Sequence, residues 1–300
     1  MFRGSALLPG NFYAASLAIY GSLCYTVNIF FIRRDTMNIT NKDIDGGKAF
    51  DWGKTSENYA KYRDIYPQEF YRCLTERGLC VNGQRVLDLG TGTGVIPRNM
   101  YRFGAKWTGC DISENQIEQA KLLAAKEGMD IDFFAAPAEE ISFPSGTFDV
   151  ITACQCFWYF DHKTVAPILA DLLGSDGRLC VMQMAWLPFD APIAGKSEEL
   201  VLKYNPTWTG GGWTRQPVHI DDAVLEHFTV EEQIGFDVNI PFTRESWNGR
   251  MKACRGVQAS LSEEETVRWE KEHMQLLEEI APEKFDILHY AAIAVLKKKA

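Results

Sequence analysis

The sequence has few cysteines and no cysteine spacing typical of a metal site. Eight cysteines stand among 300 residues, and no two of them form a C-x-x-C pair. This scarcity excludes a disulfide-stabilised scaffold and disfavours structural zinc. Cys154 and Cys156 flank one residue at the end of a predicted strand, which suits reduced thiols. We therefore predict a cytoplasmic protein that holds no metal ion.

Basic residues are fewer than acidic ones. Lys and Arg number 31 against 40 Asp and Glu, which gives a formal net charge of −9. Proteins that bind nucleic acid neutralise many phosphates and are normally basic, so nucleic acid is a disfavoured partner. The sequence also lacks internal repeats and low-complexity segments. Its 46% hydrophobic and 24% charged residues exclude disordered, fibrous and multi-span membrane proteins and predict a large buried core.

Charge is absent from one long stretch near the start of the chain. Residues 5–32 contain no charged residue, and residues 12–32 would form a helix long enough to cross a hydrocarbon core of about 30 Å. A secretory signal is disfavoured because no small-residue cleavage site follows. Two interpretations of the 1–36 extension stay open: a single membrane anchor, or a start site assigned too early with the native chain beginning at Met37. A membrane is a partner only if the extension is real.

The remaining residues, 37–300, alternate between predicted strands and helices. Strands are expected at 84–90, 105–111, 130–135, 148–154 and 178–184, and the helices between and before them at 67–77, 95–103, 113–126 and 163–173. Such alternation predicts parallel strands joined by right-handed crossovers. An insertion then occupies 185–235, rich in tryptophan and proline, and we predict that it forms a substrate cap with its own short helices. Strands at 234–242 and 285–298 and helices at 244–255 and 263–280 complete the chain.

A glycine-rich turn follows the first predicted strand. The run VLDLGTGTG (86–94) has three glycines, at the edge of the sheet where open α/β proteins bind ligands. Its spacing is not that of a dinucleotide fingerprint, because the third glycine counted from Gly90 falls on Val95. A Walker loop is excluded because no Gly-Lys-Ser/Thr is present. The turn therefore predicts a cofactor site of another kind.

Two carboxylates at the strand ends favour a cationic cofactor. A carboxylate at Asp88 would repel a pyrophosphate and attract an amino-acid cation. S-adenosylmethionine carries an ammonium and a sulfonium and has no phosphate. Asp111, which ends the second strand, is placed to accept hydrogen bonds from ribose hydroxyls, a role that suits NAD equally well. The alternative is that both carboxylates serve only as helix caps.

The DLGTGTG run (88–94) resembles the first motif of class I S-adenosylmethionine-dependent methyltransferases, close to their small-molecule "type 11" group. The resemblance covers about 59–183. It implies an α/β, Rossmann-like fold: a seven-stranded sheet ordered 3-2-1-4-5-7-6, with its last strand antiparallel, flanked by helices and carrying an insertion after strand 5. The seven strands predicted above agree with this.

The resemblance also implies a set of S-adenosyl-L-methionine contacts. The residues that match the family are Tyr59, Tyr62, Arg63, Asp88, Gly90, Thr91, Gly92, Asp111, Ile112, Ala138, Glu139 and Gln155. Asp88 and Gly90 would border the methionine moiety, Asp111 would hold the ribose, and Ile112 would pack on the adenine. The segment 59–63 resembles a lid over the cofactor. The chain departs from the family at 137–139, where an Asp-Ala pair is usual.

Methyl transfer is an in-line displacement whose leaving group departs as a neutral thioether, so positioning and exclusion of water supply most of the acceleration. A general base is needed only for a protonated acceptor, and His162 and Asp161 are the candidates. The alternative is that His162 is an ordinary exposed residue at a helix start.

Substrate contacts are expected from aromatic and basic residues. Trp158 and Tyr159 form either an apolar wall for the acceptor or part of the core. Arg250 and Arg255 either grip a carboxylate or lie on an exposed helix face.

We predict S-adenosylmethionine-dependent methyl transfer to a small organic acceptor. An NAD-linked oxidoreductase and a cofactor-binding module without catalysis are the alternatives. Methylation of RNA or protein also stays open, although the acidic charge disfavours RNA, and the sequence assigns no oligomeric state.

Overall fold

The computed structural model describes residues 44–299, apart from the side chains of Ser56, Glu57 and Tyr59. The predictions for the 1–36 extension therefore lie outside the described residues. Within the described part of the chain, no helix is both long and apolar enough to cross a membrane. The chain divides into two units, 1–35 and 36–300, and the fold below is that of the second.

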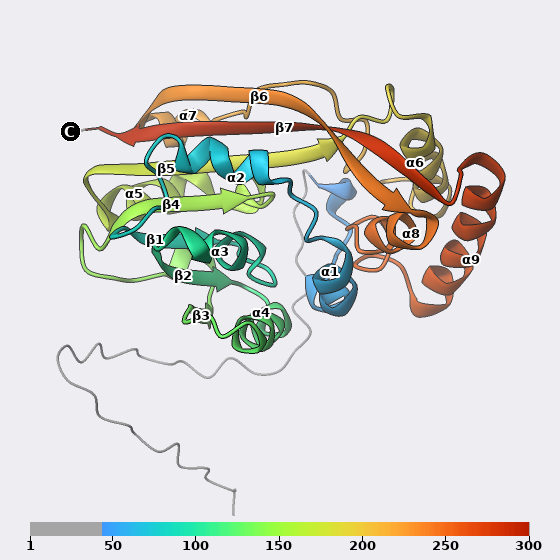
Figure 1. Ribbon diagram of the computed structural model, residues 1–300, viewed down its shortest axis with the longest axis horizontal. Helices are drawn as coiled ribbons and strands as arrows, with labels where there is room; N and C mark the ends of the chain where they lie inside the picture. Colours follow the sequence, from blue (N-terminus) through green and yellow to red (C-terminus); the bar gives the residue numbers. More distant parts are fainter. Residues whose placement is uncertain (1–43, 300) are drawn as a thin grey trace, which may run out of the picture. The chain divides into compact units, whose positions relative to one another are not determined.

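Seven strands form one sheet in the order β3-β2-β1-β4-β5-β7-β6 (Figure 1). The strands are β1 (Arg85–Leu89), β2 (Lys106–Asp111), β3 (Asp132–Ala135), β4 (Phe148–Cys154), β5 (Leu173–Trp186), β6 (Phe228–Thr243) and β7 (Lys284–Lys298). The first five run parallel, and β7 runs antiparallel to both β5 and β6. The predicted order and the antiparallel last strand are confirmed.

Helices join and cover these strands. They are α1 (Ser56–Tyr62), α2 (Gln68–Thr75), α3 (Val95–Met100), α4 (Glu114–Lys126), α5 (His162–Leu172), α6 (Pro192–Tyr204), α7 (Asp222–Leu225), α8 (Arg244–Lys252) and α9 (Glu263–Ile280). Polar side chains cap the start of two of them. The Ser113 hydroxyl accepts from the Gln116 amide at α4, and Ser262 with Glu265 forms a full capping box at α9.

Two strands are longer than predicted. β5 begins at Leu173 instead of 178, and β6 begins at Phe228 instead of 234. Leu173 pairs with Phe148 of β4 across a register shift, and Phe228 pairs with Lys298 near the end of β7. Pairing with neighbouring strands therefore extends β5 through residues 173–177, whose local sequence favours a turn, and β6 through residues 228–233, which are predicted above as part of the insertion.

The central strands are buried on both faces because successive side chains point to opposite sides. Val86 and Val150 belong to one cluster of core residues, which also holds the buried side chains of α2 and α3. Their neighbours Leu87 and Ile151 belong to a second cluster, packed under α5. The strands therefore carry apolar side chains on both faces, interrupted in β1 by Asp88 and in β4 by Asp149 and Thr152.

Three helices, α6, α8 and α9, lie together at one end of the long strands, at the right in Figure 1. A buried polar network joins them: the His273 ring nitrogens lie 2.8 Å from Asn248 Oδ1 and 2.9 Å from Ser197 Oγ. Serine and histidine also occur together in catalytic triads, but His273 is fully buried, and burial lowers its pKa to about 3. The network therefore holds the helices together and does not form a reactive site.

Candidate functional site

Two adjoining cavities lie where the parallel strands end. The smaller, of about 140 Å³, lies beside the glycine turn, and the larger, of about 350 Å³, lies between the end of β5 and the segment that contains α8. Both cavities are lined by Trp52, Arg63, Gln155 and Tyr159. These four residues therefore form a junction, at which a group bound in one cavity faces a group bound in the other.

The glycine turn between β1 and α3 lines the smaller cavity. Gly90 and Gly92 both have a φ of +55°, in the left-handed region that favours glycine. A Cβ atom added to Gly90 would lie 2.7 Å from the Cβ of Cys156, too close for two carbon atoms. The turn therefore requires glycine at this position for both conformation and space.

Asp111 holds this turn from the neighbouring strand. Its Oδ2 accepts a hydrogen bond from the Gly92 amide at 2.9 Å, and its Oδ1 accepts one from the Ser113 amide at 2.9 Å. Burial raises the pKa of the carboxyl, while these amides oppose the rise. The side chain lines the smaller cavity, in the place predicted for a ribose contact.

Asp88 lies behind the turn. Its side chain is 1% exposed and lines neither cavity. Thr152, its partner in the β1–β4 register, donates a hydrogen bond to Asp88 Oδ1 at 2.6 Å. The prediction that Asp88 borders the methionine moiety gains no support from the cavity walls, because cross-strand pairing holds this carboxylate in the interior.

The burial of Asp88 makes stability depend on pH. Burial raises its pKa from 3.8 to about 7, so the native state keeps a proton that the unfolded chain has lost. The resulting stabilisation is complete below pH 4 and disappears as the pH rises to about 7 or higher. At about 1.4 kcal/mol per pKa unit, it amounts to at most about 4 kcal/mol. In urea unfolding, we expect the Asp88→Asn variant to have a higher free energy of unfolding than the wild-type protein at pH 8. We expect this difference to disappear at pH 4. Parallel pH profiles for the two proteins would contradict this assignment.

Most of the predicted cofactor residues line the smaller cavity. They are Arg63, Gly90, Gly92, Asp111, Ile112, Ala138, Glu139 and Gln155. Two predicted residues, Thr91 and Tyr62, line neither cavity. Thr91 is buried within the turn, and the Tyr62 hydroxyl donates a hydrogen bond to Glu245 at 3.1 Å. Tyr59 belongs to α1, but its side chain lies outside the described part of the structure. Sequence reasoning missed Trp52 and Phe160, which also line this cavity.

Gln155 is held at the junction by its backbone and its side chain. It has a φ of +63°, an uncommon conformation for a residue other than glycine. Its amide donates to the Met182 carbonyl at 2.9 Å, and its side-chain Nε2 donates to the Met184 carbonyl. The end of β5 therefore fixes this side chain, and strain of this kind often marks a functional site.

The larger cavity is lined by all three predicted substrate residues, Trp158, Tyr159 and Arg250. Arg250 is only 4% exposed. The carbon of its guanidinium group lies 4.9 Å from the centre of the Trp186 ring. The remaining tryptophans of the wall are Trp52, Trp186, Trp208 and Trp213. The interpretation that Arg250 lies on an exposed helix face is therefore wrong.

The two predicted bases have other contacts. His162 lines the larger cavity, but its Nε2 lies 3.0 Å from the Phe157 carbonyl oxygen, and its ring stacks on that of Phe157. Asp161 is exposed, lines neither cavity and caps α5. A hydrogen bond from Thr164 lowers the pKa of Asp161. The prediction that either residue acts as a base gains no support from this geometry.

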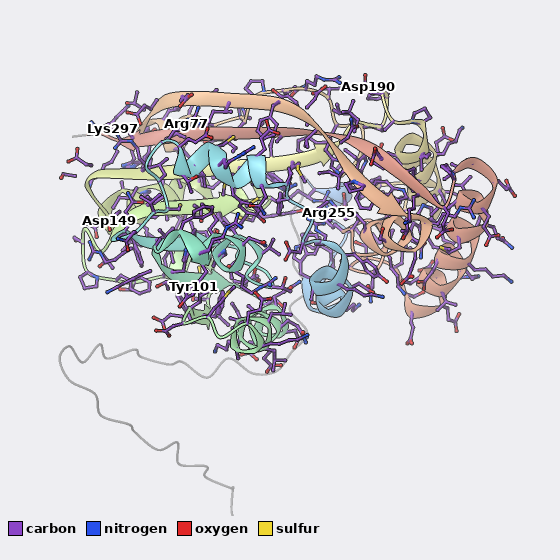
Figure 2. The ribbon with its side chains drawn as sticks, viewed as in Figure 1. Arg77, Tyr101, Asp149, Asp190, Arg255 and Lys297 are labelled. Atoms are coloured by element: carbon purple, nitrogen blue, oxygen red, sulfur yellow. The ribbon has the colours of Figure 1, made fainter. Side chains whose placement is uncertain are left out.

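A segment that sequence reasoning missed lies against the larger cavity. We call residues 44–55 the N-terminal strap. The buried Asp45 carboxylate pairs with Arg255, whose Nε lies 2.7 Å from Oδ2. Arg255, labelled in Figure 2, also donates to the Tyr159 hydroxyl at 2.6 Å. Asp45 and Arg255 are 210 positions apart, so no local pattern in the sequence signals their pairing.

Comparisons with known proteins find relatives among methyltransferases. A family model described as "Methyltransferase domain" matches residues 86–175. The chain is 31% identical over 182 residues to a ubiquinone biosynthesis O-methyltransferase of Nitrosococcus oceani, covering 58% of this chain and 76% of the relative. It is 36% identical over 138 residues to the protein of the same name from Bordetella pertussis, covering 45% and 57% respectively. The solved structure of the YcgJ protein of Bacillus subtilis is 17% identical, with a TM-score of 0.47, and the match covers 78% of this chain and 100% of that one.

Proposed function

The chain belongs to the class I S-adenosylmethionine-dependent methyltransferases, and from this premise we propose that the smaller cavity holds S-adenosylmethionine and the larger one a small organic acceptor. The observation that carries the proposal is the junction of the two cavities. Methyl transfer needs donor and acceptor within near-attack distance, and two cavities that share a wall meet that need.

The residues of the smaller cavity fit the cofactor. Gly90 and Gly92 line the cavity in left-handed conformations that favour glycine, so the backbone of the turn is open to a ligand at these positions. Asp111 would accept hydrogen bonds from the ribose hydroxyls, and Ile112 with Ala138 would pack on the adenine. When bound, the cofactor supplies an electrophilic methyl group on a positively charged sulfur.

The chain's own residues would then orient the acceptor and exclude water. Gln155 stands at the junction in a fixed conformation, and the tryptophans of the larger cavity would cover the acceptor. The N-terminal strap would close the same cavity, because Asp45 is tied to Arg255 on its wall. Removing water in this way keeps the nucleophile unsolvated and reactive. The name of the relatives, ubiquinone biosynthesis O-methyltransferase, supports a small acceptor and an oxygen as the methylated atom.

Calorimetry with the Asp111→Ala variant tests the cofactor site. We expect the wild-type protein to bind S-adenosylmethionine and not NAD. Loss of a charged acceptor should weaken binding by about tenfold or more in Asp111→Ala. Asp132→Ala, which removes an exposed carboxylate at the start of β3, should bind normally. Binding of NAD, or unchanged affinity in Asp111→Ala, would contradict the proposal.

A further inference from the structure

The larger cavity has arginines on its wall. Among residues 44–299, its charged lining side chains are Arg63, Arg250 and Arg255, and no Asp or Glu of that range lines it. The Arg255 guanidinium is paired with the buried Asp45 carboxylate. The other titratable side chains on the wall are Tyr159, His162, His219 and Cys254. An acceptor that enters this cavity therefore meets guanidinium groups and aromatic rings, an environment that suits a flat anion.

Three of the four other titratable side chains on the wall are held by neighbouring atoms of the protein. The His162 ring is bound to the Phe157 carbonyl, and the Tyr159 oxygen accepts from Arg255. The Cys254 sulfur lies 3.3 Å from a terminal nitrogen of Arg250. The fourth, His219, is exposed to solvent. A phenol, an alcohol or an ammonium group would need a base within hydrogen-bond reach, whereas a carboxylate is already ionised at neutral pH.

Arg250 is close to the place where methyl transfer would occur. Its guanidinium group stacks on Trp186, which follows Met184 by two residues on β5. The Met184 carbonyl accepts the side-chain amide of Gln155, at the junction. Two residues of a strand span about 7 Å, so a small molecule can contact both Arg250 and the junction. Guanidinium groups bind carboxylates in a fixed geometry, often through two hydrogen bonds.

We propose that the acceptor is a small organic acid with a flat apolar body, and that a carboxylate oxygen of this acid receives the methyl group. This inference rests on the methyltransferase function proposed above. A lone pair of the carboxylate oxygen forms the new bond to the methyl carbon. The carbon–sulfur bond breaks, its electron pair stays on sulfur, and the sulfonium becomes a neutral thioether. The product is a methyl ester, and no proton is released.

The stability of the transferred label in alkali tests the proposal. The full chain is incubated with S-adenosylmethionine tritiated in its methyl group and with benzoate, cinnamate, phenol, benzylamine, or the small-molecule fractions of bacterial and yeast extracts. We expect acidic acceptors to be labelled, and mild alkali to release the label as volatile methanol, because esters hydrolyse. Label that survives alkali, as in an aryl ether or an N-methyl group, would overturn the proposal and leave the methyltransferase function standing. Absence of transfer to every acceptor would overturn both.

The Arg250→Gln variant tests the role of the guanidinium group. Once a labelled acid is identified, we expect its KM to rise about 10- to 100-fold in Arg250→Gln, the effect of losing a charge-assisted contact. The affinity for S-adenosylmethionine should not change, which shows that the variant is folded. The carboxamide analogue of the acid, used as a competitive inhibitor, should lose much less affinity. Equal losses for the acid and its amide would mean that Arg250 only shapes the cavity, and would contradict its assignment.

Discussion

Alanine in place of Gly90 is expected to weaken cofactor binding and to destabilise the protein. The added Cβ would lie 2.7 Å from Cys156 Cβ and 2.8 Å from its sulfur. The left-handed backbone conformation costs about 1–2 kcal/mol for a residue with a side chain, and the overlap costs about 1–3 kcal/mol more. Relief of this overlap would move the turn, whose Gly92 amide is bound by Asp111. We therefore expect at least a tenfold loss of S-adenosylmethionine affinity, roughly 1.4 kcal/mol, by calorimetry, together with a lower urea midpoint.

Gly128→Ala is a matched control for the cost of placing a side chain on a left-handed backbone. Gly128 has a φ of +68°, and an added Cβ would find nothing within 4 Å. The stability of this variant should fall only by the cost of the left-handed backbone, about 1–2 kcal/mol, and it should bind the cofactor normally. If Gly90→Ala were no worse than Gly128→Ala in both measurements, the contact with Cys156 would not constrain the turn.

Asp45→Ala is expected to produce the second large effect, because it leaves the Arg255 guanidinium buried without its carboxylate. Asp45 accepts hydrogen bonds from Arg255 through both oxygens, and its Oδ1 also accepts from the Thr209 amide at 2.7 Å. Removal of one partner from a buried ion pair costs about 3–5 kcal/mol. We expect a loss of this size in urea unfolding and a higher KM for the acceptor, since Arg255 and Thr209 both line the larger cavity.

The double variant Asp45→Ala/Arg255→Met separates charge from packing. It removes both charges, so it should recover most of the lost stability, whereas the acceptor KM should stay high because the strap is no longer held. Glu199→Ala breaks an exposed pair with Lys196 and should change stability very little. A double variant no more stable than Asp45→Ala would show that the buried charge is not the cause of the loss.

The sequence predicted some residues of the site correctly and not others, and the difference has a physical explanation. Gly90, Asp111 and Ile112 lie within one β-α-β unit, whose turn chemistry and strand ends can be recognised along the chain. Their position on the smaller cavity is therefore predictable from local sequence. The role of Asp161 is not, because the same residue type suits a base and a helix cap, and only the fold distinguishes the two.

The amino-acid sequence by itself determined the helices between the parallel strands and the glycine turn, because periodicity and glycine spacing act over a few dozen residues. The strand order followed from the family resemblance that this turn carries. The tertiary structure decided what lines the larger cavity. Asp45, Gln155 and Arg250 come from distant parts of the chain, and only packing brings their regions to one cavity. It also decided that Asp88 faces the interior, since the register of β1 against β4 places Thr152 beside it. Long-range contacts of this kind depend on how elements pack, and the local pattern of residues does not encode them.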